Sequence, residues 1–194
     1  MTDPTSTEHA VGDPPEVQPL FRQAQLLLLL EVVTLRRATT RTMDRLAYYD
    51  FFAANPFMVV SGAAPRDERD RLTLRLNAFS EHQVSYNATG QRFVSRRRRM
   101  QYDMTRLSAL GLSHLSDAAG WHLTDHGRGV AAQLDTQYAD AFRQSADLVV
   151  RRLHPLSDRA MRAAAETWLG RSWLLVDFLD DVRTIEDEPG EVRA

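Results

Sequence analysis

Four consecutive arginines, Arg96 to Arg99, are the strongest chemical signal in this 194-residue chain. A guanidinium group presents a planar set of N–H donors that pairs with phosphates and carboxylates. Neighbouring side chains on a helix point about 100° apart, so four in a row cannot all reach one ligand. If Met100 and Met104 face inward, Arg98 points away from the core.

Two interpretations of this basic run are open. In the first, the helix contacts DNA phosphates or an acidic partner through Arg92, Arg96, Arg97, Arg98, Arg99, Arg106 and, in an adjoining hairpin, His122. In the second, which has equal weight, the arginines form a solvated face or ion pairs within an acid-rich chain. The net charge of -2 is not that of a protein that binds duplex DNA by charge alone, so any DNA contact is local.

His122 and His126, four residues apart, are the nearest approach to a metal-binding pattern. On one helix this spacing would bring two imidazoles to one metal ion. The pair instead straddles an expected strand-to-helix junction, and no third ligand is apparent. The GxxxxGK(S/T) and GxGxxG phosphate loops and the GxSxG nucleophile motif are also absent. We therefore predict no catalytic residue, no metal site and no cofactor, and hence that the chain is not an enzyme.

The amino-acid composition excludes several classes of site and of protein. The chain contains no cysteine, which excludes disulfides, thiolate metal sites and thiol catalysis. A hydrophobic content of 43% is ample for a core. Residues 1–20 are polar and proline-containing, without a basic region followed by an apolar stretch, so we expect no secretion signal and a cytoplasmic location.

The segment around the arginines has the element order of a winged helix. Ser95 is a favourable N-cap, and Gly111 marks the end of the helix because glycine adopts positive φ without strain. Strands are expected over Leu112–Leu115 and Trp121–Leu123, joined by the polar tip Asp117–Gly120. We predict a mainly α fold, a winged-helix domain with a small β-hairpin wing and flanking N- and C-terminal helices.

Two helices are expected before this segment. Residues 20–38 are apolar nearly all round, which indicates a core helix or an interface helix, too short to span a bilayer that needs about 20 apolar residues. Thr42 caps a helix over Met43–Asn55. Residues 56–94 form an insertion whose pattern is ambiguous, although a helix over 66–79 is favoured.

Two further helices are expected after the hairpin. The first, Asp125–Leu153, is capped by Thr124, and the second runs from its cap at Ser157 to about Thr184. The apolar side chains of the second helix cover more than one face, which favours a subunit contact. The predicted protein-interface residues are Leu26, Leu27, Leu30, Trp168, Trp173 and Phe178.

These elements give the expected domain organisation. It comprises a disordered leader (1–19), a winged-helix domain (20–156) with its insertion at about 56–94, a C-terminal interaction helix (157–184) and an acidic tail (185–194).

The order of several short motifs resembles the middle component of bacterial ABC-three-component systems, a group similar to the small subunit of Lamassu-type anti-phage defence. The resemblance covers about Leu20 to Leu156. Its residues are the leucine-rich helix Phe21–Leu35, the stretch Tyr49-Asp50-Phe51-Phe52, Arg96 and Arg97, Leu107 with Leu110-Gly111-Leu112, Trp121 and His122, Leu123–Gly127, and Tyr138-Ala139 with Phe142.

The resemblance implies a non-catalytic subunit that connects an SMC-like ABC ATPase to an effector, often a nuclease. In such a complex, sensing of foreign or abnormal DNA ends is coupled to the effector. The four-arginine run is more basic than the pair found in this family, and the insertion has no motif that can be aligned. The resemblance therefore does not specify which effector the subunit would bind.

Two other classes of function are alternatives to this one. A dimeric winged-helix transcription regulator would place the arginine helix in the major groove and the tip Asp117–Gly120 over a minor groove. A toxin or nuclease is disfavoured because the sequence has no recognisable metal constellation.

Overall fold

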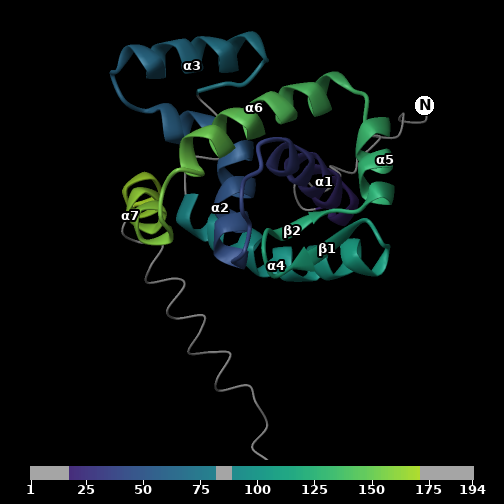
Figure 1. The fold of residues 1–194 in the computed structure, drawn as a ribbon. Coiled ribbons are helices and arrows are strands. Elements are labelled where there is room, and N and C mark those ends of the chain that lie inside the picture. The colour runs from purple at the N-terminus through teal and green to yellow at the C-terminus, as the bar shows by residue number, and fades with distance from the viewer. Residues whose placement is uncertain (1–17, 82–88, 171–194) are drawn as a thin grey trace, which may run out of the picture.

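Most of the described chain is helical, and one pair of strands forms an antiparallel hairpin (Figure 1). The computed structural model describes residues 18–81 and 89–170. The elements are α1 (Pro19–Leu35), α2 (Met43–Ala54), the 3-10 helix η2 (Pro56–Val60), α3 (Pro65–Leu76), α4 (Thr89–Ala109), β1 (Ser113–Ser116), β2 (Gly120–Leu123), α5 (Asp125–Gln133), α6 (Gln137–Leu153) and α7 (Asp158–Leu169). The prediction of a mainly helical fold with a small hairpin is confirmed.

The leucine-rich helix α1 lies at the centre of the core. Helices α2, α4, α5 and α6 and strand β2 all pack against it. Leu26, Leu27 and Leu30, which the sequence analysis assigned to a protein interface, are therefore buried inside the chain. Of the two alternatives left open for this helix, the core helix is the one that the structure shows.

Hydroxyl side chains begin three helices where the sequence predicted caps. Thr42, Thr124 and Ser157 each accept a hydrogen bond from the backbone N–H three residues further on, at 3.2, 2.9 and 3.2 Å. Such a bond satisfies one of the free N–H groups of a first helical turn. Gly111, with φ 68°, ends α4 as predicted.

The predicted start of α4 at Ser95 is wrong, because the helix is already formed at Thr89. Phe93 and Val94 are buried and extend the apolar face towards the N-terminus. Ser95 therefore lies inside the helix, whose first six residues fall within the range 56–94 that the sequence left ambiguous.

The single helix expected over 125–153 is instead two helices. Helix α5 ends at Gln133, and Leu134 leaves helical geometry with ψ 73°. Thr136 then caps α6 by accepting a hydrogen bond from the N–H of Ala139 at 3.1 Å. A threonine cap in the middle of an apolar pattern thus interrupts the expected helix.

The last predicted helix is shorter than expected. Helix α7 ends at Leu169, because Gly170 takes φ 80° and ψ 157° and leaves helical geometry. The rest of the predicted interaction helix, including Trp173 and Phe178, lies outside the described residues, as do residues 1–17 of the leader and the acidic tail.

The hairpin is tied to the connection between α1 and α2. Ser113 pairs with Leu123 in β1 and β2, and Thr40 forms an isolated parallel bridge with Gly120. The Thr40 N–H donates to the carbonyl of Ala119 at 3.0 Å, and its hydroxyl donates to the carbonyl of Trp121 at 2.7 Å. A Cβ on Gly120 would overlap the backbone of Thr40, so this close approach requires glycine.

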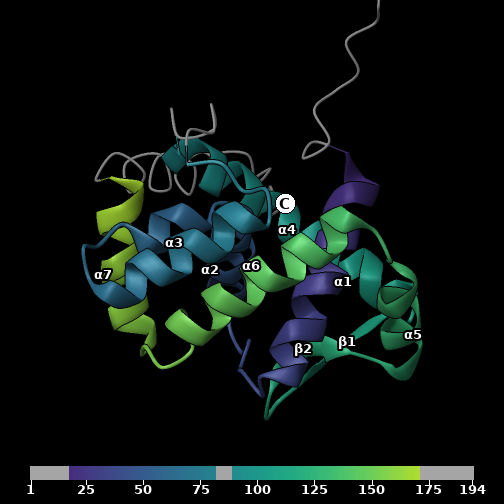
Figure 2. The same ribbon diagram turned by 90° about the horizontal axis from the view of Figure 1, so that it is seen from above.

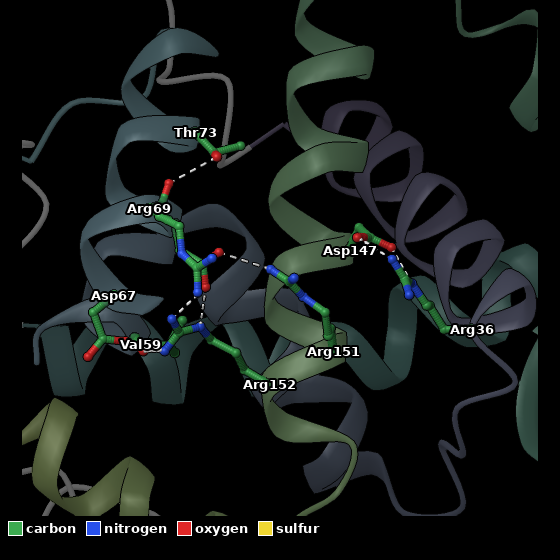
Figure 3. Close-up of polar contacts among 9 residues, drawn as sticks. Arg36, Val59, Asp67, Arg69, Thr73, Asp147, Arg151 and Arg152 are labelled. Carbon is green, nitrogen blue, oxygen red and sulfur yellow. Dashed lines mark hydrogen bonds and ion pairs between the residues drawn. The ribbon is translucent and has the colours of Figure 1, made fainter. Parts of the chain in front are cut away.

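The predicted helix within the insertion is present as α3, and ion pairs attach it to α6. Arg152 contacts Asp67 at 2.6 Å and Asp70 at 2.5 Å, while Arg151 contacts Asp70 at 3.0 Å. Figure 3 shows the side chains of Arg151 and Arg152 directed from α6 towards α3.

In both Figure 1 and Figure 2, α7 lies at one end of the molecule, and the hairpin and α5 lie at the other.

Candidate functional site on helix α4

The solvent-facing side of α4 carries arginines. Arg98, Tyr102 and Arg106 follow one another at four-residue spacing and are exposed, Tyr102 by 62%. We call these three residues the basic stripe. The acidic residue of α4 is Asp103, whose carboxylate is buried. Because α4 presents no carboxylate to solvent, its outer face is suited to an anionic surface.

Arg96, by contrast, points into the protein. Its Nη2 donates to Asp50 Oδ1 at 2.8 Å, and its Nε donates to Asp50 Oδ2. Asp50 is 2% exposed, so the pair is largely shielded from water. For Arg96 the interpretation as an internal ion pair therefore describes the structure.

A hydrogen-bonded chain joins this pair to two further helices. Arg96 Nη2 also donates to Gln25 Oε1 at 2.8 Å, and Gln25 Nε2 donates to the hydroxyl of Tyr138 at 2.5 Å. Asp50, Arg96 and Tyr138 all belong to the short motifs selected in the sequence analysis. These motif residues thus share one network that connects α1, α2, α4 and α6.

The other arginines of the run have different surroundings. Arg97 donates to Asp44 of α2 at 2.7 Å, in a pair that is partly exposed on both sides. Arg99 Nε donates to the carbonyl of Ser95 at 3.0 Å within α4. The run is therefore divided among a buried pair, a surface pair, the basic stripe and one residue, Arg99, bonded to its own helix.

Between α1, α2 and α4 lies a cavity of about 280 Å³. Its lining residues are Arg22, Phe51, Asn55, Gln91, Arg92, Ser95, Arg96 and Arg99. Burial lowers the pKa of Arg99, and the nearby positive charges of Arg22 and Arg96 lower it further, against the opposing effect of Asp103. This cavity brings Arg92, Arg96 and Arg99 of the predicted site together.

The histidines of the hairpin lie opposite each other on paired strands. His114 pairs with His122, and their ring centroids are 3.7 Å apart. The Nδ1 of His122 lies 2.8 Å from the carbonyl oxygen of Gly120. His126 is exposed in the first turn of α5.

Trp168, the predicted interface residue that lies on α7, is partly buried against α2. Its ring meets Phe52 edge-on, with centroids 5.1 Å apart and planes inclined at 81°. Part of the apolar surface of α7 is thus covered by the chain itself.

The structure adds residues that the sequence analysis did not select. Arg22 of α1 forms a two-point ion pair with Asp103, at 2.7 and 3.0 Å, and lines the cavity. Tyr102 is the aromatic member of the basic stripe. The sequence did contain a signal for Arg22. It is a charged residue at the start of a leucine-rich helix, and a charged group needs a partner when it is buried.

No protein-family model, curated protein or solved structure matches the chain. Over residues 18–81 and 89–170 there is no group of three or more His, Cys, Asp or Glu that could hold a metal ion. Within those same ranges, no helix is both long and apolar enough to cross a membrane.

Proposed function

We propose that this chain is a non-catalytic winged-helix subunit that links an SMC-like ABC ATPase to an effector in a bacterial anti-phage defence complex. The motif order in the sequence motivates the proposal. The observation that carries it is a pair of exposed surfaces of unlike chemistry on separate parts of the fold.

The order of elements supports the winged-helix part of the proposal. The three helices of a winged helix correspond to α1, α2 and α4, and its hairpin corresponds to β1 and β2. Thr40, which bridges to the hairpin, lies between α1 and α2. In a winged helix a short strand between the first two helices pairs with the hairpin, which is the position of Thr40. The stretch containing η2 and α3 is then an insertion between the second and third helices.

The first of the two surfaces is the basic stripe of α4. Its positive side chains fit an acidic face of a partner subunit or the phosphates of DNA held by the complex. The aromatic ring of Tyr102, between the two arginines, adds the kind of amphipathic contact that is common at interfaces.

The second surface lies on α3 and presents two exposed leucines among charged side chains. Leu72 and Leu76 are one helical turn apart and exposed by 56% and 78%. In Figure 1 α3 lies at the top of the molecule and α4 near its lower edge. Two proteins could therefore bind at the same time, as a linking subunit requires.

Affinity purification of the tagged chain from its native host tests this proposal. The wild type should recover a large coiled-coil ATPase and one further protein, identified by mass. Arg98→Glu with Arg106→Glu should lose one of them, and Leu72→Arg with Leu76→Arg should lose the other. Arg159→Glu, at an exposed position on α7, is the matched charge control and should retain both. Recovery of only a homodimer with DNA would contradict the proposal.

A dimeric winged-helix transcription regulator is the second candidate, and the basic stripe is the observation that favours it. A regulator that contacts several phosphates should lose affinity as salt rises, with a slope of about -0.9 per contact in the logarithm of the association constant against log salt, and should prefer one operator sequence. Fluorescence anisotropy on unrelated duplexes measures both properties. Equal affinity for every duplex would reject the regulator.

A further inference from the structure

The cavity between α1, α2 and α4 has a cationic wall. Arg22 enters it from α1, and Arg92, Arg96 and Arg99 enter it from α4. Among the described residues that line it there is no carboxylate, while Gln91, Ser95 and Asn55 add polar groups. A ligand inside would therefore meet guanidinium groups on more than one side.

Two of these arginines are fixed in place. Asp103 holds Arg22 through two hydrogen bonds at 2.7 and 3.0 Å, and Asp50 holds Arg96 through a second two-point pair. Both carboxylates are buried. Charged side chains that are already ordered lose little conformational entropy when a ligand arrives.

The positive charge of Arg99 is not paired with either of these carboxylates, which bind Arg22 and Arg96. Within the described part of the chain it forms no ion pair, and its Nε donates to the Ser95 carbonyl of its own helix. It lies close enough to Arg22 and Arg96 for their charges, together with burial, to lower its pKa. An anion placed at Arg99 would relieve this repulsion.

We infer that this cavity binds the phosphate group of a small phosphorylated molecule, with Arg99 as the principal contact and Arg22 and Arg96 as fixed flanking positive charges. Guanidinium groups match phosphate oxygens in two-point geometry. A volume of about 280 Å³ is at the small end of ligand pockets. It is far too small for a DNA duplex, whose major groove alone is about 12 Å wide.

The inference is independent of the proposed linking role. None of the three residues of the basic stripe, Arg98, Tyr102 and Arg106, lines the cavity, although the cavity and the stripe share helix α4. Variants of Arg99 and of Arg106 therefore test different surfaces.

Calorimetric titration of the full chain tests the phosphate site. The probes are inorganic phosphate, AMP and, as the ligand that lacks phosphate, adenosine. Phosphate and AMP should bind and adenosine should not. Arg99→Gln should weaken AMP binding by at least about tenfold, the loss expected for one charge-assisted hydrogen bond. Arg99→Lys should retain part of the affinity, and Arg106→Gln should retain all of it.

A short single-stranded DNA with and without a 5′-phosphate distinguishes the two sources of such a group. If only the phosphorylated strand displaces AMP, the phosphate that binds is that of a strand end. If neither strand displaces AMP, the site takes a free mononucleotide. Circular dichroism establishes that each variant is folded, and Arg92→Gln, at an exposed lining position, replaces Arg99→Gln if the latter unfolds. Absence of binding by phosphate and AMP at millimolar concentration, or equal weakening by Arg99→Gln and Arg106→Gln, would overturn the inference.

Discussion

Asp50 of α2 and Arg96 of α4 form a two-point ion pair across the interface of the two helices, with Arg96 Nη2 at 2.8 Å from Asp50 Oδ1. The pair is largely buried, and Gln25 of α1 shares the same guanidinium group. Because it joins three helices, the pair contributes to the stability of the fold. Each arginine of the run has different partners, so each is expected to respond differently to substitution.

Asp50→Asn should destabilise the protein by about 3–5 kcal/mol, because it leaves the partly buried cation of Arg96 without its carboxylate. Asp44→Asn removes the exposed partner of Arg97 and should cost about 1 kcal/mol or less. Urea unfolding followed by circular dichroism measures both. Equal losses for the two variants would show that burial of the Asp50 pair does not matter.

Gly127→Ala and Gly129→Ala should have opposite effects, although both lie in α5. A Cβ on Gly127 would overlap the carbonyl group of Leu112, whereas nothing lies within 4 Å of a Cβ on Gly129. The first change should therefore cost more than about 2 kcal/mol, from forced backbone displacement. The second should stabilise by up to about 1 kcal/mol, the difference in helix propensity. Thermal melting compares them, and stabilisation by both would refute the close packing at Leu112.

The contribution of Asp70 should depend on pH. Burial raises its pKa, but hydrogen bonds and charges from Arg152 and Arg151 outweigh this, so the pKa lies below its ordinary value. A lowered pKa in the folded state means that the stabilisation is complete above the unfolded pKa of about 3.9 and is lost as the pH falls through the folded value. The difference in unfolding free energy between wild type and Asp70→Asn should thus be largest near neutral pH and shrink below about pH 4. A difference that is constant from neutral to acid pH would contradict this.

Trp168→Ala should weaken the attachment of α7 to α2. The partly buried ring of Trp168 packs edge-on against Phe52, so its removal should cost about 2–4 kcal/mol, somewhat less than for a fully buried aromatic side chain. Thr167→Ala, at the exposed neighbouring position, is the control and should change stability by less than about 0.5 kcal/mol. Denaturant midpoints provide the comparison, and similar midpoints for both variants would mean that α7 is held elsewhere.

Local signals predicted the parts of the fold that depend on adjacent residues. The caps at Thr42 and Thr124, the turn at Gly111 and the hairpin were all predicted because each needs only a few neighbouring side chains. The break at Leu134 was missed, since the apolar pattern continues across it and a threonine cap is a weak signal inside such a pattern.

The candidate site was less predictable, because its chemistry depends on residues that are distant in the sequence. Arg96 meets Asp50 across 46 positions, and Arg22 meets Asp103 across 81. Helical spacing correctly placed Arg98 on the outside. It could not indicate which of its neighbours would find a buried carboxylate.

The central position of α1 also bears on how the chain is synthesised. Gln25 precedes its partner Tyr138 by 113 positions, and Arg22 precedes Asp103 by 81. At about 5–20 residues per second, the five consecutive leucines of α1, Leu26–Leu30, remain without their α6 neighbours for roughly 5–25 seconds after they are made. The core can therefore close only when most of the chain has left the ribosome, and during that interval the leucine helix is the segment most exposed to wrong association.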